Sequence, residues 1–277
     1  MQNTQQITRA MKFVSAAKLR RAQENALSAR PYARQILRVL RSAIARIEHP
    51  IHPLLARREG KCILLLSVSG DKGLCGAFNT NILRKSLEFL RERSGLKIQV
   101  IPIGKKSRDA LRKRNVSFVA EYPGIFSKVQ FAHAKQISDR VSEMYTSGQV
   151  DTVYAIFNEF KSVLAQRLLV EKLLPIDPEV FAANEQGNVP AQVDYIYEQR
   201  PADILGQLLP RYLETQVYRL LLESAAAEHA ARMTAMGAAT ENARELVDTL
   251  TLHMNKVRQA AITKELIEVV SGAASAA

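Results

Sequence analysis

One short stretch of the sequence places glycines and a lysine where a nucleotide-binding loop would lie. Residues 69–76 read Ser-Gly-Asp-Lys-Gly-Leu-Cys-Gly and stand between an apolar run and an amphipathic run, which predicts a turn from a strand into a helix. Neither common phosphate-binding motif has this order, because Lys72 precedes the glycines that would surround a phosphate. We favour a tight turn with positive φ angles, and nucleotide binding is the alternative.

The other reactive side chains form no recognisable catalytic pattern. Asp71, Asp109, Asp139 and the five histidines show no triad, carboxylate pair or metal cluster in sequence, although distant residues can meet in a fold. His49 and His52 have no cysteine or acidic third ligand nearby, so they are typical of a loop. Two cysteines are too few for a disulfide scaffold. The sequence predicts no catalytic residue, cofactor or metal.

The end of the chain carries a long heptad pattern. Apolar or small residues recur alternately four and three positions apart, as in a coiled coil. The members of this second seam are Leu222, Ala226, His229, Met233, Met236, Thr240, Ala243, Val247, Leu250, Met254, Val257 and Ala261. As a helix this stretch would be about 60 Å long, more than a compact domain can cover. It therefore needs a partner helix.

The beginning of the chain supplies a matching pattern. The members of this first seam are Leu19, Ala22, Ala26, Ala29, Ala33, Ile36, Leu40, Ala43 and Ile47. Because the chain between the two seams must return to its start, we expect the terminal helices to pack antiparallel. Alanine fills most of the first seam, so the pair should be thin and stiff. Pro31 removes one helical hydrogen bond and is expected to bend the first helix.

The second seam is longer than the first, so the last helix is expected to extend beyond its partner. Continued toward the free end, the first register passes through Ser15 and Lys12 and the second through Lys264 and Glu268. The apolar residues shift to other positions there, including Ile7, Met11, Val14, Ile262, Leu266 and Val269. We expect another protein to cover this tip.

The middle of the chain alternates strand and helix patterns. Strands are predicted at residues 62–69, 98–103, 116–120, 150–157 and 163–170, and helices at 79–93, 107–114 and 129–147. The predicted fold is an antiparallel coiled coil of long N- and C-terminal helices with an inserted, mostly parallel, Rossmann-like α/β domain. The expected domains are residues 1–57, 58–201 and 202–277.

The charge of the chain is unevenly distributed. The formal net charge is +12, and residues 1–48 contain ten Lys and Arg against only Glu24 and Glu48. This arm is expected to face nucleic acid, anionic lipid or an acidic protein surface. A further basic run at residues 105–114 has few aromatic residues beside it that could stack on bases. No apolar run approaches the length needed to cross a membrane.

Four segments resemble one protein family. Residues 255–268 (NKVRQAAITKELIE) are similar to the C-terminal signature of the gamma subunit of F-type ATP synthases. Residues 3–12, 69–79 and 194–198 resemble the same family and occur in its order over nearly the whole chain. The resemblance implies a non-catalytic rotor shaft without a cofactor, turning inside a hexamer of alpha and beta subunits so that proton flow drives ATP synthesis.

The resemblance also implies partner contacts. The partners are the alpha and beta subunits, the epsilon subunit and the membrane c-ring, on the cytoplasmic face of a bacterial inner membrane. Contacts with beta are expected at Met11, Lys12, Arg258, Gln259, Thr263 and Glu265, and contacts with the ring and epsilon at Tyr195, Tyr197 and Glu198. The alternative from charge alone is a basic coiled-coil protein that binds nucleic acid, with affinity that falls steeply with salt.

Overall fold

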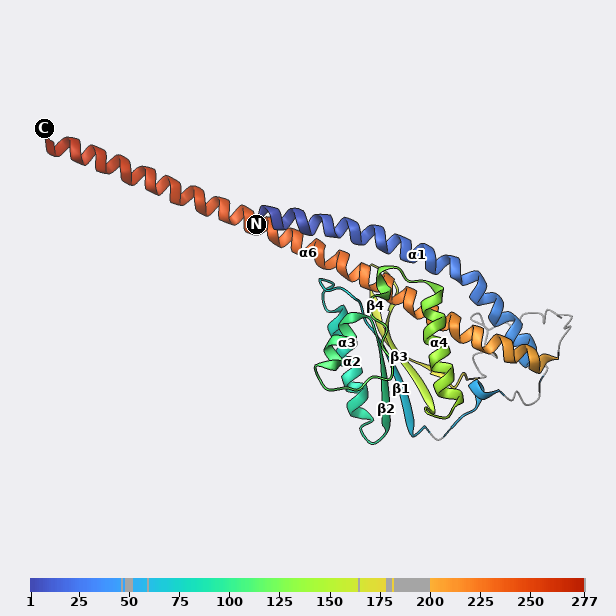
Figure 1. The fold of residues 1–277 in the computed structure, drawn as a ribbon. Helices are drawn as coiled ribbons and strands as arrows, with labels where there is room; N and C mark the ends of the chain where they lie inside the picture. The colour runs from blue at the N-terminus through green and yellow to red at the C-terminus, as the bar shows by residue number, and fades with distance from the viewer. Residues whose placement is uncertain are drawn as a thin grey trace.

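Two long helices from opposite ends of the chain dominate the molecule. The computed structural model describes residues 1–45, 47, 52–58, 60–163, 165–177, 181 and 200–276. Helix α1 (Gln2–Ile44) lies along helix α6 (Pro201–Ala276) in the opposite direction, and α6 continues far beyond the N-terminus (Figure 1). The predicted antiparallel pair is confirmed. Helix α1 continues through Pro31 and curves along α6.

A four-stranded sheet lies between the two helices in sequence. Its strands are β1 (Cys62–Val68), β2 (Lys97–Ile103), β3 (Thr152–Phe160) and β4 (Gln166–Leu174), in the spatial order β2-β1-β3-β4. β1 pairs in parallel with β2 and β3, and β4 is antiparallel to β3. The prediction of an inserted, mostly parallel α/β domain is confirmed.

Helices cover both faces of this sheet, and strand β1 shows why. Leu64 and Leu66 pack into the core shared with helix α4 (Phe131–Thr146) and with α6, whereas Ile63 and Leu65 pack toward helix α2 (Phe78–Glu92). Side chains alternate between the two faces of a strand, so an apolar run buried on both sides carries no polar alternation. Helix α3 (Lys105–Arg112) and the short helices η1 (Pro53–Leu55) and η2 (Ile125–Ser127) complete the described elements.

One predicted strand is wrong. Residues 116–120 were expected to form a strand, but they meet the sheet only at an isolated bridge between Phe118 and Val100. A second isolated bridge joins Tyr122 to Ile103. The chain then turns into helix η2 at Gly124, which has a φ of +84°. A short apolar run next to such a turn has too few residues to extend a ladder.

Among the residues that the structure describes, none of the helices has the length and apolar character needed to cross a bilayer.

Candidate functional site: the helical shaft and its joint with the sheet domain

The two seams predicted from the sequence meet along the helix pair. On α1 the seam residues Leu19, Ala22, Ile36, Leu40 and Ala43 are buried, and the alanines between them are half-buried. Leu19 and Ala22 pack with Ala226 and Ala230 of α6, so small residues hold the axes close together. The pair therefore buries little area for its length, as expected of a thin shaft.

The free end of the pair has a polar seam. The Thr240 hydroxyl of α6 lies 2.8 Å from the Thr8 hydroxyl of α1, and both helices continue past this contact. Ser15 is buried and donates to the carbonyl oxygen of Met11. The prediction that Lys12 lies on the seam is wrong. Lys12 is exposed and Met11 is half-buried instead, because the contact follows Thr8, Met11 and Ser15 at spacings of three and four.

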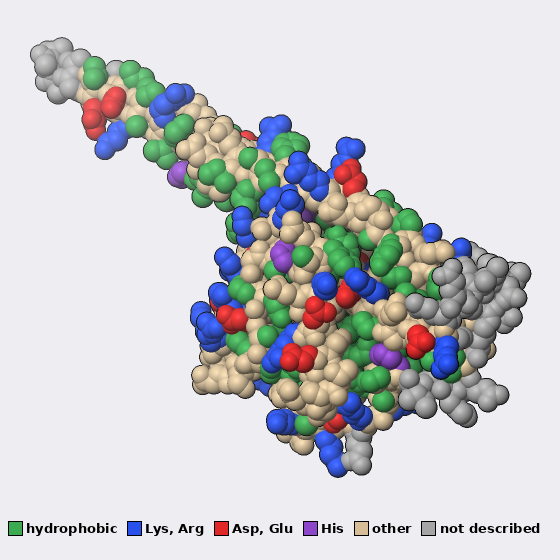
Figure 2. Space-filling model, turned by 45° about the vertical axis from the view of Figure 1, so that its right-hand side comes forward, with side chains coloured by type: hydrophobic (Ala, Val, Ile, Leu, Met, Phe, Trp, Pro, Cys, Tyr) green, Lys and Arg blue, Asp and Glu red, His purple; other side chains and the backbone are tan. Residues whose placement is uncertain are grey.

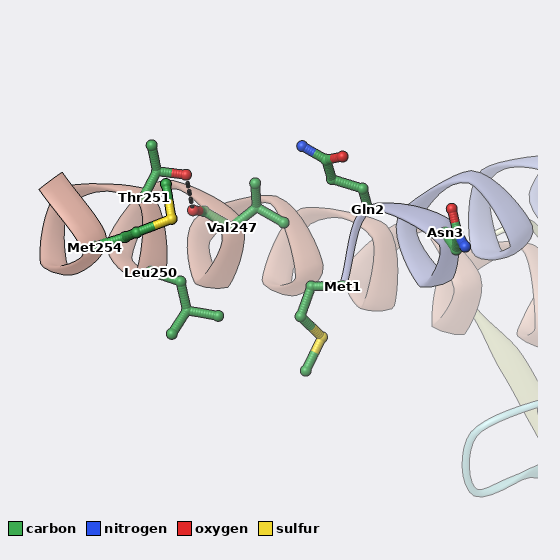
Figure 3. Close-up of a pocket in the computed structure, with 7 residues that line it drawn as sticks. All are labelled: Met1, Gln2, Asn3, Val247, Leu250, Thr251 and Met254. Atoms are coloured by element: carbon green, nitrogen blue, oxygen red, sulfur yellow. Dashed lines mark hydrogen bonds between the residues drawn. The ribbon is translucent and has the colours of Figure 1, made fainter. Parts of the chain in front are cut away.

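Helix α1 begins beside residues 247–254 of α6. Met1, Gln2 and Asn3 lie along one side of a shallow hollow whose other side is formed by Val247, Leu250, Thr251 and Met254 (Figure 3). Beyond this point α6 runs on alone to Ala276. The expected overhang is confirmed.

The overhang is a single helix with exposed apolar side chains. Leu252 is 65% exposed, Val257 56% and Leu266 60%. Hydrophobic side chains lie along the projecting helix in Figure 2, mixed with basic and acidic ones. A solvated helix gains little from apolar residues that pack on nothing, so this surface is suited to contact with another protein.

The middle of the helix pair is joined to the sheet domain through a buried ion pair. Arg232 and Glu228 are separated by one turn of α6, and Nη2 of Arg232 lies 2.5 Å from Oε1 of Glu228. Their side chains are 8% and 3% exposed. The Arg232 Nε donates to the carbonyl oxygen of Gly73 at 3.1 Å, and Nη2 donates to that of Lys72 at 3.4 Å. Nη1 lies 3.2 Å from Nδ1 of His229. The glycine-rich turn at residues 69–76 is therefore docked on α6.

A second carboxylate organises the same turn from inside the domain. The Asp71 Oδ1 accepts hydrogen bonds from the backbone N–H groups of Lys105 (2.9 Å) and Gly124 (2.8 Å), and Oδ2 accepts from that of Phe126 (2.9 Å). Asp71 thus holds the amide at the start of α3, which in a phosphate loop would face the anion. Leu74 and Gly76 have φ of +59° and +56°, so the predicted tight turn is confirmed.

Comparison with known proteins agrees with this arrangement. Residues 1–276 match the protein family described as ATP synthase. The ATP synthase gamma chain of Solibacter usitatus is 52% identical over 280 residues, which cover 100% of this chain and 95% of that protein. The gamma chain of Pelotomaculum thermopropionicum is 45% identical, with 99% of this chain and 95% of that protein covered. The chain belongs to the ATP synthase gamma chain family.

Solved structures support the same fold for this gamma chain. A chain of the Tetrahymena thermophila mitochondrial ATP synthase central stalk and c-ring has a TM-score of 0.63 and 26% identity, with 84% of this chain and 99% of that chain covered. Members of the gamma chain family are the non-catalytic rotor subunit of the central stalk. The resemblance predicted from the sequence is confirmed, and it favours the rotor over the nucleic-acid-binding alternative.

The residues of this gamma chain that were predicted to contact a beta subunit lie at two positions along the shaft. The Lys12 side chain approaches Gly237 of α6, within 3.8 Å of where a Cβ on that glycine would lie. Arg258 is 21 positions further along α6 (258 − 237), which corresponds to about 30 Å. Gln259, Thr263 and Glu265 are exposed on the same overhang as Arg258, and the Thr263 hydroxyl donates to the carbonyl oxygen of Gln259.

Three predicted contacts lie outside the described residues. They are Tyr195, Tyr197 and Glu198, which were expected to contact the ring and epsilon.

The sequence reasoning missed the joint. Arg232 and Glu228 were not singled out, and His229 was only a member of the second seam. The available signal was their position, because the pair lies within the seam stretch at the spacing of one helical turn. Charges at such a place are buried when the helices pack, and a buried charge needs a partner.

The space at Gly70 makes a first test of the joint. A Cβ at this position would lie 2.6 Å from the Glu228 carboxyl carbon, and that carboxylate cannot swing away cheaply because Arg232 holds it. We expect Gly70→Ala to lower the free energy of unfolding by about 1–3 kcal/mol, as overpacking does. Urea denaturation measures this. Gly95→Ala, where nothing lies within 4 Å, is the control, and an equal loss at both positions would contradict the account.

The histidine at the joint predicts a pH dependence. Burial, together with the positive charges of Arg232 and Lys18, lowers the pKa of His229 from 6.5 to about 4. Below pH 6.5 the unfolded chain therefore binds a proton that the folded chain does not bind. Stability from this group is present at pH 7.5 and is lost as the pH falls toward 4, by about 2 kcal/mol at pH 5.

A variant isolates the histidine contribution. Burial raises the pKa of Glu228, despite the neighbouring Arg232, and this acts in the opposite direction over the same pH range. The quantity to measure is thus the difference in unfolding free energy between the chain and His229→Gln at pH 7.5 and at pH 5. The difference should shrink at pH 5. A constant difference would show that His229 does not titrate as stated.

Proposed function

We propose that this chain is the shaft that transmits rotation between a proton-driven membrane ring and the catalytic hexamer of an ATP synthase. The observation that carries the proposal is the C-terminal part of α6, which projects from the sheet domain with exposed apolar and charged side chains. A helix in this state is stabilised when a surrounding protein covers it. A ring of alpha and beta subunits supplies such a surrounding.

The shape of the molecule supports a driving rather than a scaffolding role. The sheet domain lies to one side of the helix pair, so the molecule is not symmetric about the axis of the pair (Figure 1). When a lopsided shaft turns in a ring of similar sites, each site meets a different surface in turn. The proposed mechanism is that these surfaces bias each beta subunit between open, loose and tight conformations.

The charged residues supply the proposed contacts. Lys12 is exposed on α1 at the level of Gly237, where it can meet acidic groups of a beta subunit. Arg258 and Glu265 lie two turns apart on one side of the overhang, and Gln259 and Thr263 lie one turn apart on another. Hydrogen bonds from such groups to a beta loop would be made and broken as the shaft turns.

We further propose contacts with the membrane part of the complex. Tyr195, Tyr197 and Glu198 are proposed to contact the membrane c-ring and the epsilon subunit. The chain itself is proposed to lie at the cytoplasmic face of a bacterial inner membrane, held there through the ring rather than by a span of its own.

Assembly tests this function directly. The purified chain is mixed with alpha and beta subunits, and the mass of the product is measured at low and at high salt. A rotor gives a saturable complex with one copy of the chain. The nucleic-acid alternative would give no complex with alpha and beta, and would give binding to DNA or RNA that falls steeply with salt.

A further inference from the structure

Helix α6 is tied to the sheet domain by a first arginine, Arg219. Its guanidinium forms an ion pair with Glu171 of strand β4. The same group also contacts Gln216 through Nε at 2.9 Å and Glu223 through Nη1 at 3.4 Å, both on α6 itself. It lies 5.9 Å from the centre of the Phe157 ring on β3. The contacts with Glu171 and Phe157 leave the helix and join it to the sheet.

A second arginine ties the helix to a different part of the domain. Arg232 donates to the carbonyl oxygens of Lys72 and Gly73 in the turn after β1. The Glu228 carboxylate, one helical turn earlier on α6, fixes the Arg232 guanidinium. Thus one arginine holds the edge strand β4 and the other holds the glycine-rich turn.

The two attachments lie at different heights and on different faces of α6. They are 13 positions apart (232 − 219), which is about 20 Å along the helix axis. At about 100° per residue, the two side chains leave the axis about 140° apart. The two attachments are therefore offset both along and around the helix, so a rotation of the helix relative to the domain strains at least one of them.

Apolar packing between these points acts differently. Leu220, Leu221 and Ala227 are buried against the sheet domain. Such contacts oppose separation of the helix from the sheet but have little directional preference. Guanidinium hydrogen bonds are directional, so they oppose rotation of the helix relative to the sheet.

We propose that Arg219 with Glu171, and Arg232 with the turn at residues 72–73, are the torque-bearing contacts through which the sheet domain turns the shaft. This inference rests on the proposed rotor function. It assigns to these polar groups a role that packing alone does not provide. When torque acts between the helix and the sheet domain, loss of one attachment allows the helix to rotate relative to the domain.

The test compares a loaded joint with an unloaded one. Glu171→Gln, Arg219→Gln and the double variant are built into the full ATP synthase and into the complex of this chain with alpha and beta alone. ATP hydrolysis by the smaller complex turns the shaft without a ring to resist it. ATP synthesis by the full enzyme, driven by an imposed proton gradient, requires torque to pass through the joint.

The expected result is a split between the two activities. Each single variant should lower ATP synthesis by about tenfold while leaving hydrolysis by the smaller complex within about twofold. The double variant should be no worse than either single variant, because the two side chains form one contact. Synthesis that stays unchanged, or that falls in parallel with hydrolysis, would overturn the proposal.

Two controls separate the possible failures. Arg211→Gln removes an arginine whose ion pair with Glu214 stays within α6, so it should leave the ratio of synthesis to hydrolysis unchanged. Ile82→Val in the core of α2 loosens the domain away from α6 and should lower both activities together, if either. If the unmodified chain forms no complex with alpha and beta, the proposed function fails and not the joint alone.

Discussion

Replacing Arg232 with alanine is expected to lower the free energy of unfolding by about 3–5 kcal/mol, because it leaves the carboxylate of Glu228 buried without its counter-charge. Glu228 is 3% exposed in its side chain, and one of its oxygens, Oε2, already has no hydrogen-bond partner among the described residues. The loss of Arg232 also leaves the carbonyl oxygens of Gly73 and Lys72 without a donor from α6. Chemical denaturation of the isolated chain measures the change.

The double variant supplies the matched control. Arg232→Met with Glu228→Gln removes both charges but keeps side chains of similar size, so it should recover much of the stability that the single change loses. Arg244→Ala, at an exposed pair with Glu241, should cost less than about 0.5 kcal/mol. A cost for Arg232→Ala as small as that of Arg244→Ala would mean that the ion pair does not join the domain to the shaft.

Replacing Arg258 with alanine is expected to lower ATP synthesis by the assembled complex by tenfold or more, about the effect of losing one buried charged contact at an interface. The stability of the isolated chain should not change. Arg258 is exposed on the overhang, and none of the hydrogen bonds or ion pairs found among the described residues involves it. The measurements are the thermal midpoint of the chain and the synthesis rate of the complex.

Lys256→Ala is the control for this prediction. Lys256 is exposed two positions from Arg258 and lies about 160° away around the helix, so it tests loss of charge without loss of the proposed contact. Synthesis should then stay close to that of the unmodified complex. Equal losses at both positions would indicate a general effect of charge, and an unchanged rate for Arg258→Ala would remove that residue from the contact surface.

The sequence predicted the shaft well because a coiled coil repeats the same residue spacing along its length. Leu19, Ala22, Ile36 and Leu40 follow a single spacing, and each lies in the buried seam. The overhang followed from unequal seam lengths. The error at Lys12 arose because the register was continued from Ser15 by three positions, to Lys12, whereas the contact moves by four positions, to Met11. An error of one position moves a side chain out of the seam.

The joint could not be predicted in the same way. Arg232 contacts Gly73 across 159 positions of sequence, and Arg219 contacts Glu171 across 48. No periodic pattern links such pairs, because they depend on how the sheet domain sits on the helix. The glycine-rich turn was likewise identified as a turn from its composition, but its docking on α6 appears only when Gly70 is seen to leave space for Glu228.

The proposed function requires that α1 and α6 turn together as one rigid shaft. Thr8→Cys and Thr240→Cys, in a chain whose Cys62 and Cys75 are replaced by serine, place two thiols where the hydroxyls now lie 2.8 Å apart. After oxidation the disulfide should form, and ATP-driven rotation of a bead fixed to the sheet domain should continue at the rate of the reduced complex. Failure of the disulfide to form, or rotation that stops on oxidation and resumes on reduction, would contradict the account.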